Sequence, residues 1–298
     1  MIKFLYGFLY KYKNTRFYLI IYRIIKIFLI LFYPLYCKID NNYKNNKTNE
    51  NVIISLTSFP ARIDKVWIVI ETLLRQTKSP NKIILWLAES EFNSIDDLPN
   101  NLLEQQEYGL EIKFCENLRS HKKYYYSMKC YPESIIITVD DDTFYPENLV
   151  EKLLNAHKKY PKAVCCNLAH LITSKNGNIA PYKEWESGSP GYKGPSFNLI
   201  PIGCEGVLYP PNSLNDNVFD KNKIKSICPK ADDLWLKSMA TINKVKTVKT
   251  NKTSIDYANL LTAKSGSLNS INVDKDLNDK QLANIIEEYP ELRDVWNW

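Results

Sequence analysis

Three consecutive aspartates, Asp140, Asp141 and Asp142, directly follow an apolar run at 135–139. The run is β-branched throughout, which is typical of a strand buried on both faces of a parallel sheet. Side chains alternate on an extended chain, so Asp140 and Asp142 are expected on one side and Asp141 on the other. Two carboxylates on one side suit a hard divalent cation or its complex with a phosphate. An acidic loop that caps the next helix is the alternative, although Pro146 already marks a helix start.

A second polar stretch, 57–62, is expected at the same edge of the sheet, because it follows a strand predicted at 52–56. Thr57, Ser58 and Arg62 supply two hydroxyls and a guanidinium, which suit the ribose, base or phosphates of a nucleotide. Ser58 has an equally good interpretation as the N-cap of the helix that follows. The stretch is a candidate nucleotide-binding loop.

A third polar stretch, 117–123, is basic and leads into a helix predicted at 120–129. Arg119, Lys122 and Lys123 lie where this helix begins, and positive charge there opposes the helix dipole. A bound anion would account for the arrangement, and a solvated basic patch is the alternative.

The elements that position these stretches alternate along the chain. Strands that alternate with helices indicate an α/β domain with a mainly parallel sheet. In such sheets ligands bind beyond the carboxyl ends of the strands, which is where the aspartates fall. The periodicity predicts strands at 52–56, 82–88, 110–115, 135–139 and 163–167, and helices at 63–76, 120–129, 147–160 and 234–239.

The N-terminal segment has a membrane-seeking composition. Residues 17–36 are strongly apolar but contain Arg23 and Lys26, which are costly near the centre of a bilayer. On a helical wheel Arg16, Arg23 and Lys26 share a narrow arc, which favours a helix in the membrane interface with its basic side toward anionic head groups. A single-pass anchor is the alternative, whereas a secretory signal peptide would need a small-residue cleavage site. The expected aromatic belt comprises Tyr6, Tyr10, Tyr12, Tyr18, Tyr22 and Tyr33.

Charge and cysteine content limit the function classes. The net charge of +6 over 298 residues is modest and much of it lies in the N-terminal segment. It favours a membrane surface or phosphate-bearing ligands over nucleic acid. The seven cysteines are an odd number and include no Cys-x-x-Cys pair, which favours a reducing compartment and argues against structural zinc. We therefore expect a peripheral or monotopic protein at the cytoplasmic face of the membrane.

Four stretches of the chain together resemble the GT-A glycosyltransferases, particularly bacterial enzymes that build surface polysaccharides. The resemblance implies a GT-A glycosyltransferase domain at 52–261, preceded by a membrane-associated helix at 1–40 and a linker at 41–51 and followed by a helical extension at 262–298. In that extension Asp279, Leu282, Ile285 and Ile286 predict a short amphipathic helix, and Asp294-Val295-Trp296 predicts a second. The four matching stretches are Val52-Ile53-Ile54-Ser55-Leu56-Thr57-Ser58-Phe59-Pro60, the basic loop 119–123, the Asp-x-Asp pattern of Asp140 and Asp142, and Ala231-Asp232-Asp233-Leu234-Trp235.

On the donor side, the resemblance implies a nucleotide-diphosphate sugar, with UDP as the expected nucleotide, and a divalent ion, Mn²⁺ or Mg²⁺. Asp140 would match the carboxylate on the ribose side, and Asp142, with Asp140, would bind the metal. The ion would neutralise the leaving diphosphate as the glycosidic bond breaks. The implied donor contacts are Thr57, Ser58, Arg62, Arg119, Lys122, Lys123, Asp140 and Asp141.

On the acceptor side, Asp232 and Asp233 resemble the acidic pair that follows the acceptor loop in inverting members of the family. The resemblance implies that Asp233 deprotonates the acceptor hydroxyl and that Asp232 orients it. A neighbouring anion raises the pKa of one member of such a pair, which suits a general base. Helix capping is the alternative for Asp232. The implied acceptor contacts are Gly203, Glu205, Gly206 and two sugar-stacking residues, Trp185 and Trp235, with a core position as the alternative for Trp235.

One departure from the family concerns the metal. Many metal-dependent relatives supply a late histidine ligand, but all three histidines here precede residue 171. The ion is then expected to be held by Asp142, the donor diphosphate and water. His121 and His170 are expected to be polar core or loop residues rather than ligands.

Other functions fit the pattern less well. A metal-dependent phosphohydrolase of the haloacid dehalogenase class would need threonine at position 144, where Phe144 stands. A sugar nucleotidyltransferase would need a glycine-rich loop after the first strand, and 55–62 contains no glycine. A catalytically inactive, membrane-bound glycan-binding or scaffold protein is the non-enzyme alternative. We predict a metal-assisted, inverting hexosyltransferase of surface polysaccharide synthesis that acts on a glycan or lipid-linked acceptor.

Overall fold

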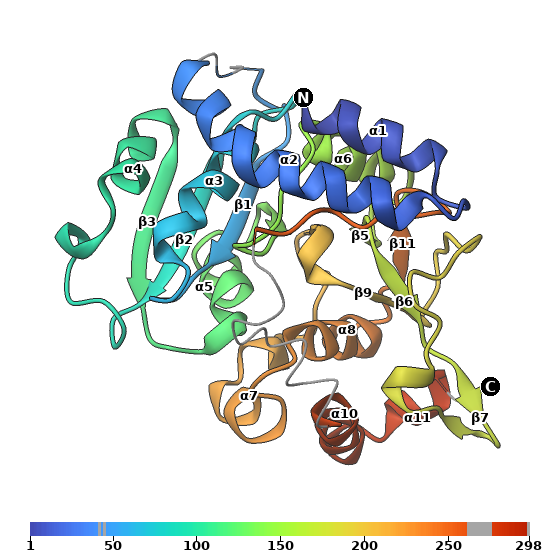
Figure 1. Cartoon of the computed structure of the whole chain (residues 1–298). Coiled ribbons are helices and arrows are strands. Elements are labelled where there is room, and N and C mark those ends of the chain that lie inside the picture. The colour runs from blue at the N-terminus through green and yellow to red at the C-terminus, as the bar shows by residue number, and fades with distance from the viewer. Residues whose placement is uncertain (41–42, 44–45, 261–275, 297–298) are drawn as a thin grey trace.

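The computed structural model describes residues 1–40, 43, 46–260 and 276–296 and is built around one large sheet (Figure 1). Its seven strands follow the order β11-β5-β10-β4-β1-β2-β3. Among these described strands, β10 is antiparallel to both neighbours and the others run parallel to one another. The predicted α/β class with a mainly parallel sheet is therefore confirmed. The strands are β1 (Val52–Thr57), β2 (Lys82–Ala88), β3 (Leu110–Cys115), β4 (Ile135–Thr138), β5 (Val164–Cys166), β10 (Val207–Tyr209) and β11 (Thr247–Lys249).

Helices cover both faces of the sheet, and the side chains of β1 alternate between them. Val52, Ile54 and Leu56 join one core with α1, α2, α3 and α6, whereas Ile53 belongs to a cluster on the face covered by α5. These four side chains are almost completely buried, as expected of a strand that is covered on both faces. The covering helices are α1 (Ile2–Lys11), α2 (Tyr18–Ile39), α3 (Ile63–Leu74), α5 (Lys122–Cys130) and α6 (Leu149–Lys159).

A further core lies against the part of the sheet formed by β5 and β10. α8 (Asp232–Ile242) packs there, and α10 (Leu277–Glu288) and α11 (Glu291–Trp296) pack on α8. The two helices predicted near the end of the chain are thus confirmed, whereas the predicted boundary at 262 falls outside the described residues. The remaining short elements are α4 (Asn100–Leu103), α7 (Lys221–Ile227), the pair β6 (Ala169–Leu171) and β9 (Leu199–Pro201), and the hairpin of β7 (Ser174–Lys175) and β8 (Asn178–Ile179).

The sequence pattern located five of the seven strands of the large sheet and several of the longer helices, and it missed most of the other elements. The five predicted strands are β1 to β5, and the helices predicted at 63–76, 120–129, 147–160 and 234–239 are α3, α5, α6 and α8. No pattern predicted β9, β10 or β11, which have three residues each. Such short strands carry no readable period, and their place in the sheet is decided by pairing with distant segments.

The N-terminal helices lie side by side along one edge of the molecule (Figure 1). α2 is long and apolar enough to cross a membrane, by length and composition alone. Its inner face is buried against the body at both ends, from Tyr18 through Leu29 to Cys37. Its outer face is apolar and more than half exposed at Leu19, Ile20, Ile24, Ile27, Leu31, Leu35 and Ile39.

Two details of the predicted interfacial helix are wrong. Tyr6, Tyr18 and Tyr33 are buried against the body instead of forming an aromatic belt. The side chain of Lys26 donates a hydrogen bond to the side chain of Asn259 instead of facing head groups, although Arg23 remains exposed. The physical reason is that the body offers polar and apolar partners to this face of α2, which a helical wheel cannot represent.

Candidate functional site

The aspartate triplet, Asp140, Asp141 and Asp142, lies just beyond β4 at the carboxyl edge of the parallel strands. The chain turns at Asp141 and Asp142 and no longer continues as a strand. Arg62 Nη1 consequently reaches both residues, at 2.6 Å from Asp141 Oδ1 and 3.2 Å from Asp142 Oδ2. Asp141 and Asp142 therefore do not lie on opposite sides as strict alternation would place them, because alternation holds only while the backbone stays extended. The pairing of Asp140 with Asp142 stays a prediction.

Polar contacts from the first β–α loop hold the buried Asp141. Ser58 Oγ donates a hydrogen bond of 2.6 Å to Asp141 Oδ2, and Arg62 donates to the other oxygen. Burial raises the pKa of Asp141, and Arg62 opposes that rise. Burial and the nearby Asp140 raise the pKa of Asp142 to about 6. The predicted site residues Ser58 and Arg62 thus meet the triplet directly.

Lys123 joins the triplet to the acidic pair, Asp232 and Asp233. Its Nζ lies 2.7 Å from Asp140 Oδ1 and 2.9 Å from Asp232 Oδ2, and its side chain is buried. Burial alone would lower the pKa of Lys123, but Asp140 and Asp232 raise it well above its usual value. Lys123 is therefore a cation held between two carboxylates, and its predicted contact with a phosphate stays a prediction.

The acidic pair opens α8, directly after Ala231. Burial tends to raise the pKa of Asp232, but Lys123 and His121 leave it below the usual value. Burial, with the adjacent Asp232 charge, instead raises the pKa of Asp233 to about 7. The backbone N–H of Gly203 donates to Asp233 Oδ2 at 3.1 Å. One member of the pair thus stays ionised, and the other holds its proton near neutral pH.

Gly203 allows these groups to approach one another. A Cβ atom at this position would lie 3.0 Å from Asp233 Oδ1 and 3.0 Å from Lys123 Nζ. Real Cβ atoms rarely make such close contacts, so any larger residue would push the two charged groups aside. The predicted acceptor loop does reach the site at Gly203.

Tyr145 is a site residue that the sequence did not reveal. Its buried hydroxyl accepts a hydrogen bond from the backbone N–H of Asp140 at 2.8 Å and donates to the carbonyl oxygen of Cys204 at 2.9 Å. It ties the triplet to the loop that carries Gly203. A lone tyrosine five residues after a strand end has no distinctive spacing, so no sequence signal identified it.

Residues 258–260 and the N-terminal helix α1 together hold the backbone around the triplet. Tyr6 Oη donates to the carbonyl oxygen of Phe144 at 2.9 Å and accepts from the N–H of Ala258 at 2.8 Å. The N–H of Leu260 donates to the carbonyl oxygen of Asp142 at 2.6 Å. The N-terminal helices, which the sequence places outside the predicted domain at 52–261, thus contact the segment after the triplet directly.

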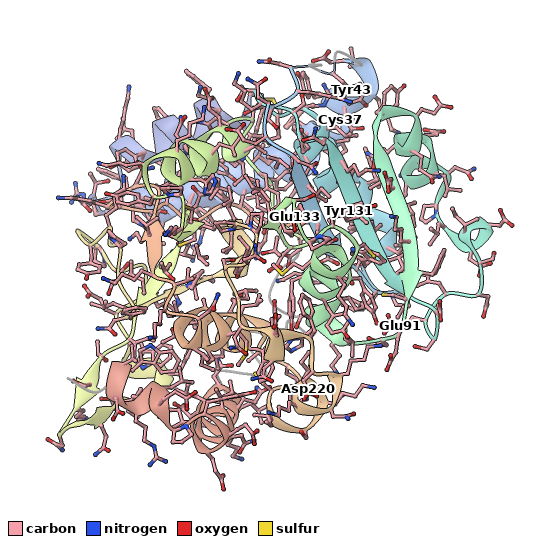
Figure 2. The ribbon with its side chains drawn as sticks, turned by 180° about the vertical axis from the view of Figure 1, so that it is seen from behind. Cys37, Tyr43, Glu91, Tyr131, Glu133 and Asp220 are labelled. Atoms are coloured by element: carbon pink, nitrogen blue, oxygen red, sulfur yellow. The ribbon has the colours of Figure 1, made fainter. Side chains whose placement is uncertain are left out.

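Of three further predicted donor contacts, two have partners within the protein and one is exposed. Thr57 Oγ1 donates to the carbonyl oxygen of Trp86, which ties β1 to β2. Lys122 Nζ lies 3.5 Å from Glu91 Oε2, and Glu91 follows the carboxyl end of β2 (Figure 2). Arg119 is exposed. Of the basic loop, the structure leaves Arg119 as the side chain accessible to a phosphate.

The predicted sugar-stacking residues are wrong. Trp235 is fully buried and donates its indole N–H to the carbonyl oxygen of Val218. Trp185 is also buried and donates to the carbonyl oxygen of Ala180. Neither ring presents a face to a ligand, because each completes an apolar core.

Two other residues of the predicted acceptor loop turn away from the acidic pair. Glu205 is buried and accepts a hydrogen bond from the N–H of Tyr257 at 3.2 Å, and burial raises its pKa to about 8. Gly206 has φ +88°, and a Cβ there would lie 3.0 Å from Leu149 Cδ1. Its glycine is required by backbone conformation and helix packing.

Asp140 and Asp142 retain partly exposed side chains, at 33% and 18% of their possible surface. Within the described ranges, no group of three or more histidine, cysteine, aspartate or glutamate residues is placed to hold a metal. His121 is buried, with its ring nitrogens 3.0 Å from Tyr124 Oη and 2.8 Å from the carbonyl oxygen of Cys228. The donor set fits an ion that brings its own phosphate and water ligands, as Mg²⁺ does with one or two carboxylates.

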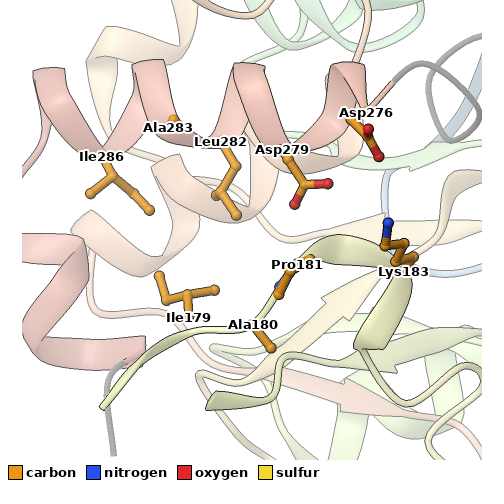
Figure 3. Close-up of a pocket in the computed structure, with 9 residues that line it drawn as sticks. All are labelled: Ile179, Ala180, Pro181, Lys183, Asp276, Asp279, Leu282, Ala283 and Ile286. Carbon is orange, nitrogen blue, oxygen red and sulfur yellow. The ribbon is translucent and has the colours of Figure 1, made fainter. Parts of the chain in front are cut away.

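A separate groove of about 430 Å³ lies between α10 and the segment that follows β8 (Figure 3). Its apolar side chains include Ile179, Leu282 and Ile286, and Asp279 lies at one side of it. Asp279 accepts a hydrogen bond from the N–H of Tyr182 at 2.8 Å. The groove contains neither the triplet nor the acidic pair, and we assign it no role in chemistry.

Comparison with known proteins adds no family assignment. No protein-family model matches the sequence, and no curated protein matches it. The geometry of the two joined acidic clusters is therefore the basis on which a function is inferred.

Proposed function

We propose that the chain is a GT-A-type glycosyltransferase that transfers a sugar from a nucleotide-diphosphate donor to a glycan or lipid-linked acceptor. The observation that carries the proposal is the bridge from Asp140 through Lys123 to Asp232, at 2.7 and 2.9 Å. It unites a strand-end triplet, an acidic pair and a glycine-bearing loop at the edge where α/β sheets bind ligands. A reaction between two substrates needs two such adjoining sets of groups.

On the donor side, Asp142 and Asp140 would hold Mn²⁺ or Mg²⁺ together with oxygens of a UDP-sugar diphosphate. When bound, the ion supplies Lewis-acid neutralisation of the leaving diphosphate. Ser58 and Arg62 keep the neighbouring Asp141 in place through hydrogen bonds of 2.6 Å. Arg119, which is exposed, is available for a charge-assisted contact with phosphate.

On the acceptor side, Asp233 acts as the general base. Its oxygen accepts the proton of the acceptor hydroxyl while the acceptor oxygen bonds to the anomeric carbon and the bond to the diphosphate breaks. A pKa of about 7 matches this task, because a base is most effective when its pKa is near the working pH. Asp232, kept ionised by Lys123, orients the acceptor. A single displacement of this kind inverts the anomeric configuration.

The proposed location is the cytoplasmic face of a membrane, with the protein peripheral or monotopic. One face of α2 is buried against the body from Tyr18 to Cys37, so the helix lies along the body and does not project from it. A helix packed in this way would have to detach before it could span a bilayer. The seven cysteines, all free, are compatible with a reducing compartment.

The test is transfer by the purified full chain from a panel of UDP-sugars, with and without EDTA. We expect activity that requires a divalent ion and falls in Asp140→Asn and Asp142→Asn. Metal-independent transfer that survives both substitutions would refute the mechanism. Binding of a sugar nucleotide is read separately by thermal shift, because a ligand of the native state raises stability by mass action.

The same preparation separates the alternatives. A scaffold protein would show no transfer with any donor, and Asp142→Ala would leave its biological role intact. A phosphohydrolase would release phosphate from simple phosphomonoesters without an acceptor.

A further inference from the structure

A groove of about 690 Å³ lies between α1, the end of α2 and the end of α3. Lys3, Gly7 and Lys11 line it from α1, with Phe4 and Phe8 beside them. Lys3, Gly7 and Lys11 recur at every fourth position, so they follow one face of the helix. The groove lies outside the proposed donor and acceptor sites.

The acidic groups of this groove already have partners. Glu147 accepts hydrogen bonds from the N–H groups of Ile2 at 2.9 Å and Lys3 at 2.6 Å, and it pairs with the N-terminal ammonium. Asp40 Oδ2 lies 3.4 Å from Arg75 Nη1. The exposed ammonium groups of Lys3 and Lys11 have no ion-pair partner among the described residues. The groove therefore has uncompensated positive charge.

Gly7 provides a second, independent observation. Glycine in the interior of a helix costs roughly 1 kcal/mol relative to alanine. A Cβ at Gly7 would meet no atom within 4 Å, so packing against the protein does not require glycine here. Its absent side chain keeps the groove open between the two lysines and exposes the backbone to whatever enters.

The surroundings of the groove are apolar. Phe4 and Phe8 are 78% and 42% exposed, and the neighbouring α2 presents its exposed aliphatic face. Large aromatic and aliphatic side chains beside basic ones are typical of helices that lie in a membrane interface. This combination favours a lipid over a soluble anion as the ligand.

We propose that the groove binds the phosphate headgroup of an anionic phospholipid. Lys3 and Lys11 pair with the phosphate, Gly7 allows the headgroup to approach the backbone of α1, and Phe4 and Phe8 lie among the acyl chains. This headgroup site orients α1 and α2 parallel to the membrane, with the body held against the cytoplasmic surface.

The first experiment measures sedimentation of the full chain with vesicles of phosphatidylcholine, alone or mixed with phosphatidylglycerol. One basic residue near an anionic surface contributes about 1 kcal/mol. We therefore expect the double variant Lys3→Gln/Lys11→Gln to bind the mixed vesicles about 30-fold more weakly, with little change on phosphatidylcholine alone. The charge-matched control is Lys244→Gln/Lys280→Gln, two exposed lysines outside the N-terminal helices, one just after α8 and one in α10. Equal losses in both double variants would overturn the site, because they would indicate a general charge effect.

The second experiment fills the groove. Gly7→Leu is expected to remove the preference for phosphatidylglycerol, whereas Gly7→Ala, which adds one methyl group, retains most of it and stabilises the helix. Unchanged preference in Gly7→Leu would refute binding in the groove. Inorganic phosphate is expected not to compete with vesicles, and effective competition would assign the site to a soluble anion instead. None of these measurements uses transfer activity, so the headgroup site is tested independently of the proposed function.

Discussion

The aspartate triplet and the acidic pair face the same lysine but differ in their other partners. Arg62 contacts Asp141 and Asp142, and Tyr145 fixes the backbone of Asp140. In the pair, Lys123 contacts Asp232, whereas Asp233 accepts a hydrogen bond from the backbone N–H of Gly203. The first arrangement keeps carboxylates in place for a cation, and the second leaves one carboxyl group able to exchange a proton.

The two clusters also differ in what supports them. The backbone around the triplet is held by hydrogen bonds from Tyr6 and Leu260, and Tyr6 also holds Ala258, so the triplet depends on the N-terminal helices. The pair instead begins α8, whose core is formed mostly by residues after 163, together with Leu118, Tyr124 and Tyr125. Damage to one support is therefore expected to affect one cluster more than the other, and Lys123 is the exception because it serves both.

The largest effect is expected from Lys123→Met. Removing one partner of a buried ion pair costs roughly 3–5 kcal/mol, because the remaining charges stay buried without compensation. Urea denaturation would measure the loss. The matched control is Lys122→Met, which removes a neighbouring buried lysine that pairs with one carboxylate, Glu91, instead of two. Equal losses of unfolding free energy in the two variants would show that Lys123 contributes no more to stability than Lys122 does.

Asp233→Asn is expected to abolish most transfer while leaving the fold intact. Loss of a general base typically costs 10²–10⁴-fold in rate, about the size we expect in kcat. Asp232→Asn is the comparison, and it should raise KM more than it lowers kcat. A variant Asp233→Asn that keeps wild-type kcat would show that the pair does not supply the base.

The pH dependence of stability distinguishes the two clusters further. The pKa of Asp233 is about 7 in the folded protein, against about 3.9 for an unperturbed aspartate. The folded state binds this proton more tightly, so the contribution to stability is present below about pH 4 and is lost as the pH rises to about 7. We expect Asp233→Asn to flatten the stability curve in that window. An unchanged curve, measured by thermal denaturation at several pH values, would contradict the raised pKa.

Loss of a metal ligand should affect the triplet alone. Asp142→Asn is expected to weaken activation by Mn²⁺ or Mg²⁺ at least about 10- to 100-fold. Mutation of residues that only support a metal ligand already has an effect of this size. Because burial raises the pKa of Asp142 to about 6, activation by the ion should also weaken in the wild-type protein below that pH. Metal titrations at pH 5 and pH 7 would measure both effects. An affinity independent of pH would contradict a role for Asp142.

Tyr6→Phe should produce the smallest effect. It keeps the ring stacked on Tyr257 but removes the hydroxyl that bridges Phe144 and Ala258. A buried donor left without a partner costs about 1–3 kcal/mol. We expect a modest loss of stability and weaker metal activation, with the acidic pair unaffected. Tyr10→Phe, on an exposed ring of the same helix, is the control.

The extent of sequence-based prediction can be seen in particular residues. The run at 135–139 predicted both a buried strand and the acidic site after it, because β-branched side chains and strand ends leave a local pattern. Trp235 could not be placed in this way, because a tryptophan beside an acidic pair is compatible with a core or a ligand surface. Tyr145 and Tyr6 had no signal, since their partners, Cys204 and Ala258, lie far away in the chain.

By itself the sequence determined the α/β class, the first five strands, the apolar N-terminal helix and the chemical types at the site. These features depend on periodicity and on residues close together in the chain. Only the tertiary structure decided that Lys123 lies between Asp140 and Asp232, that Asp233 keeps a raised pKa and that the N-terminal helices brace the triplet. Those relationships depend on burial and on contacts between distant segments, which exist only once the chain has folded.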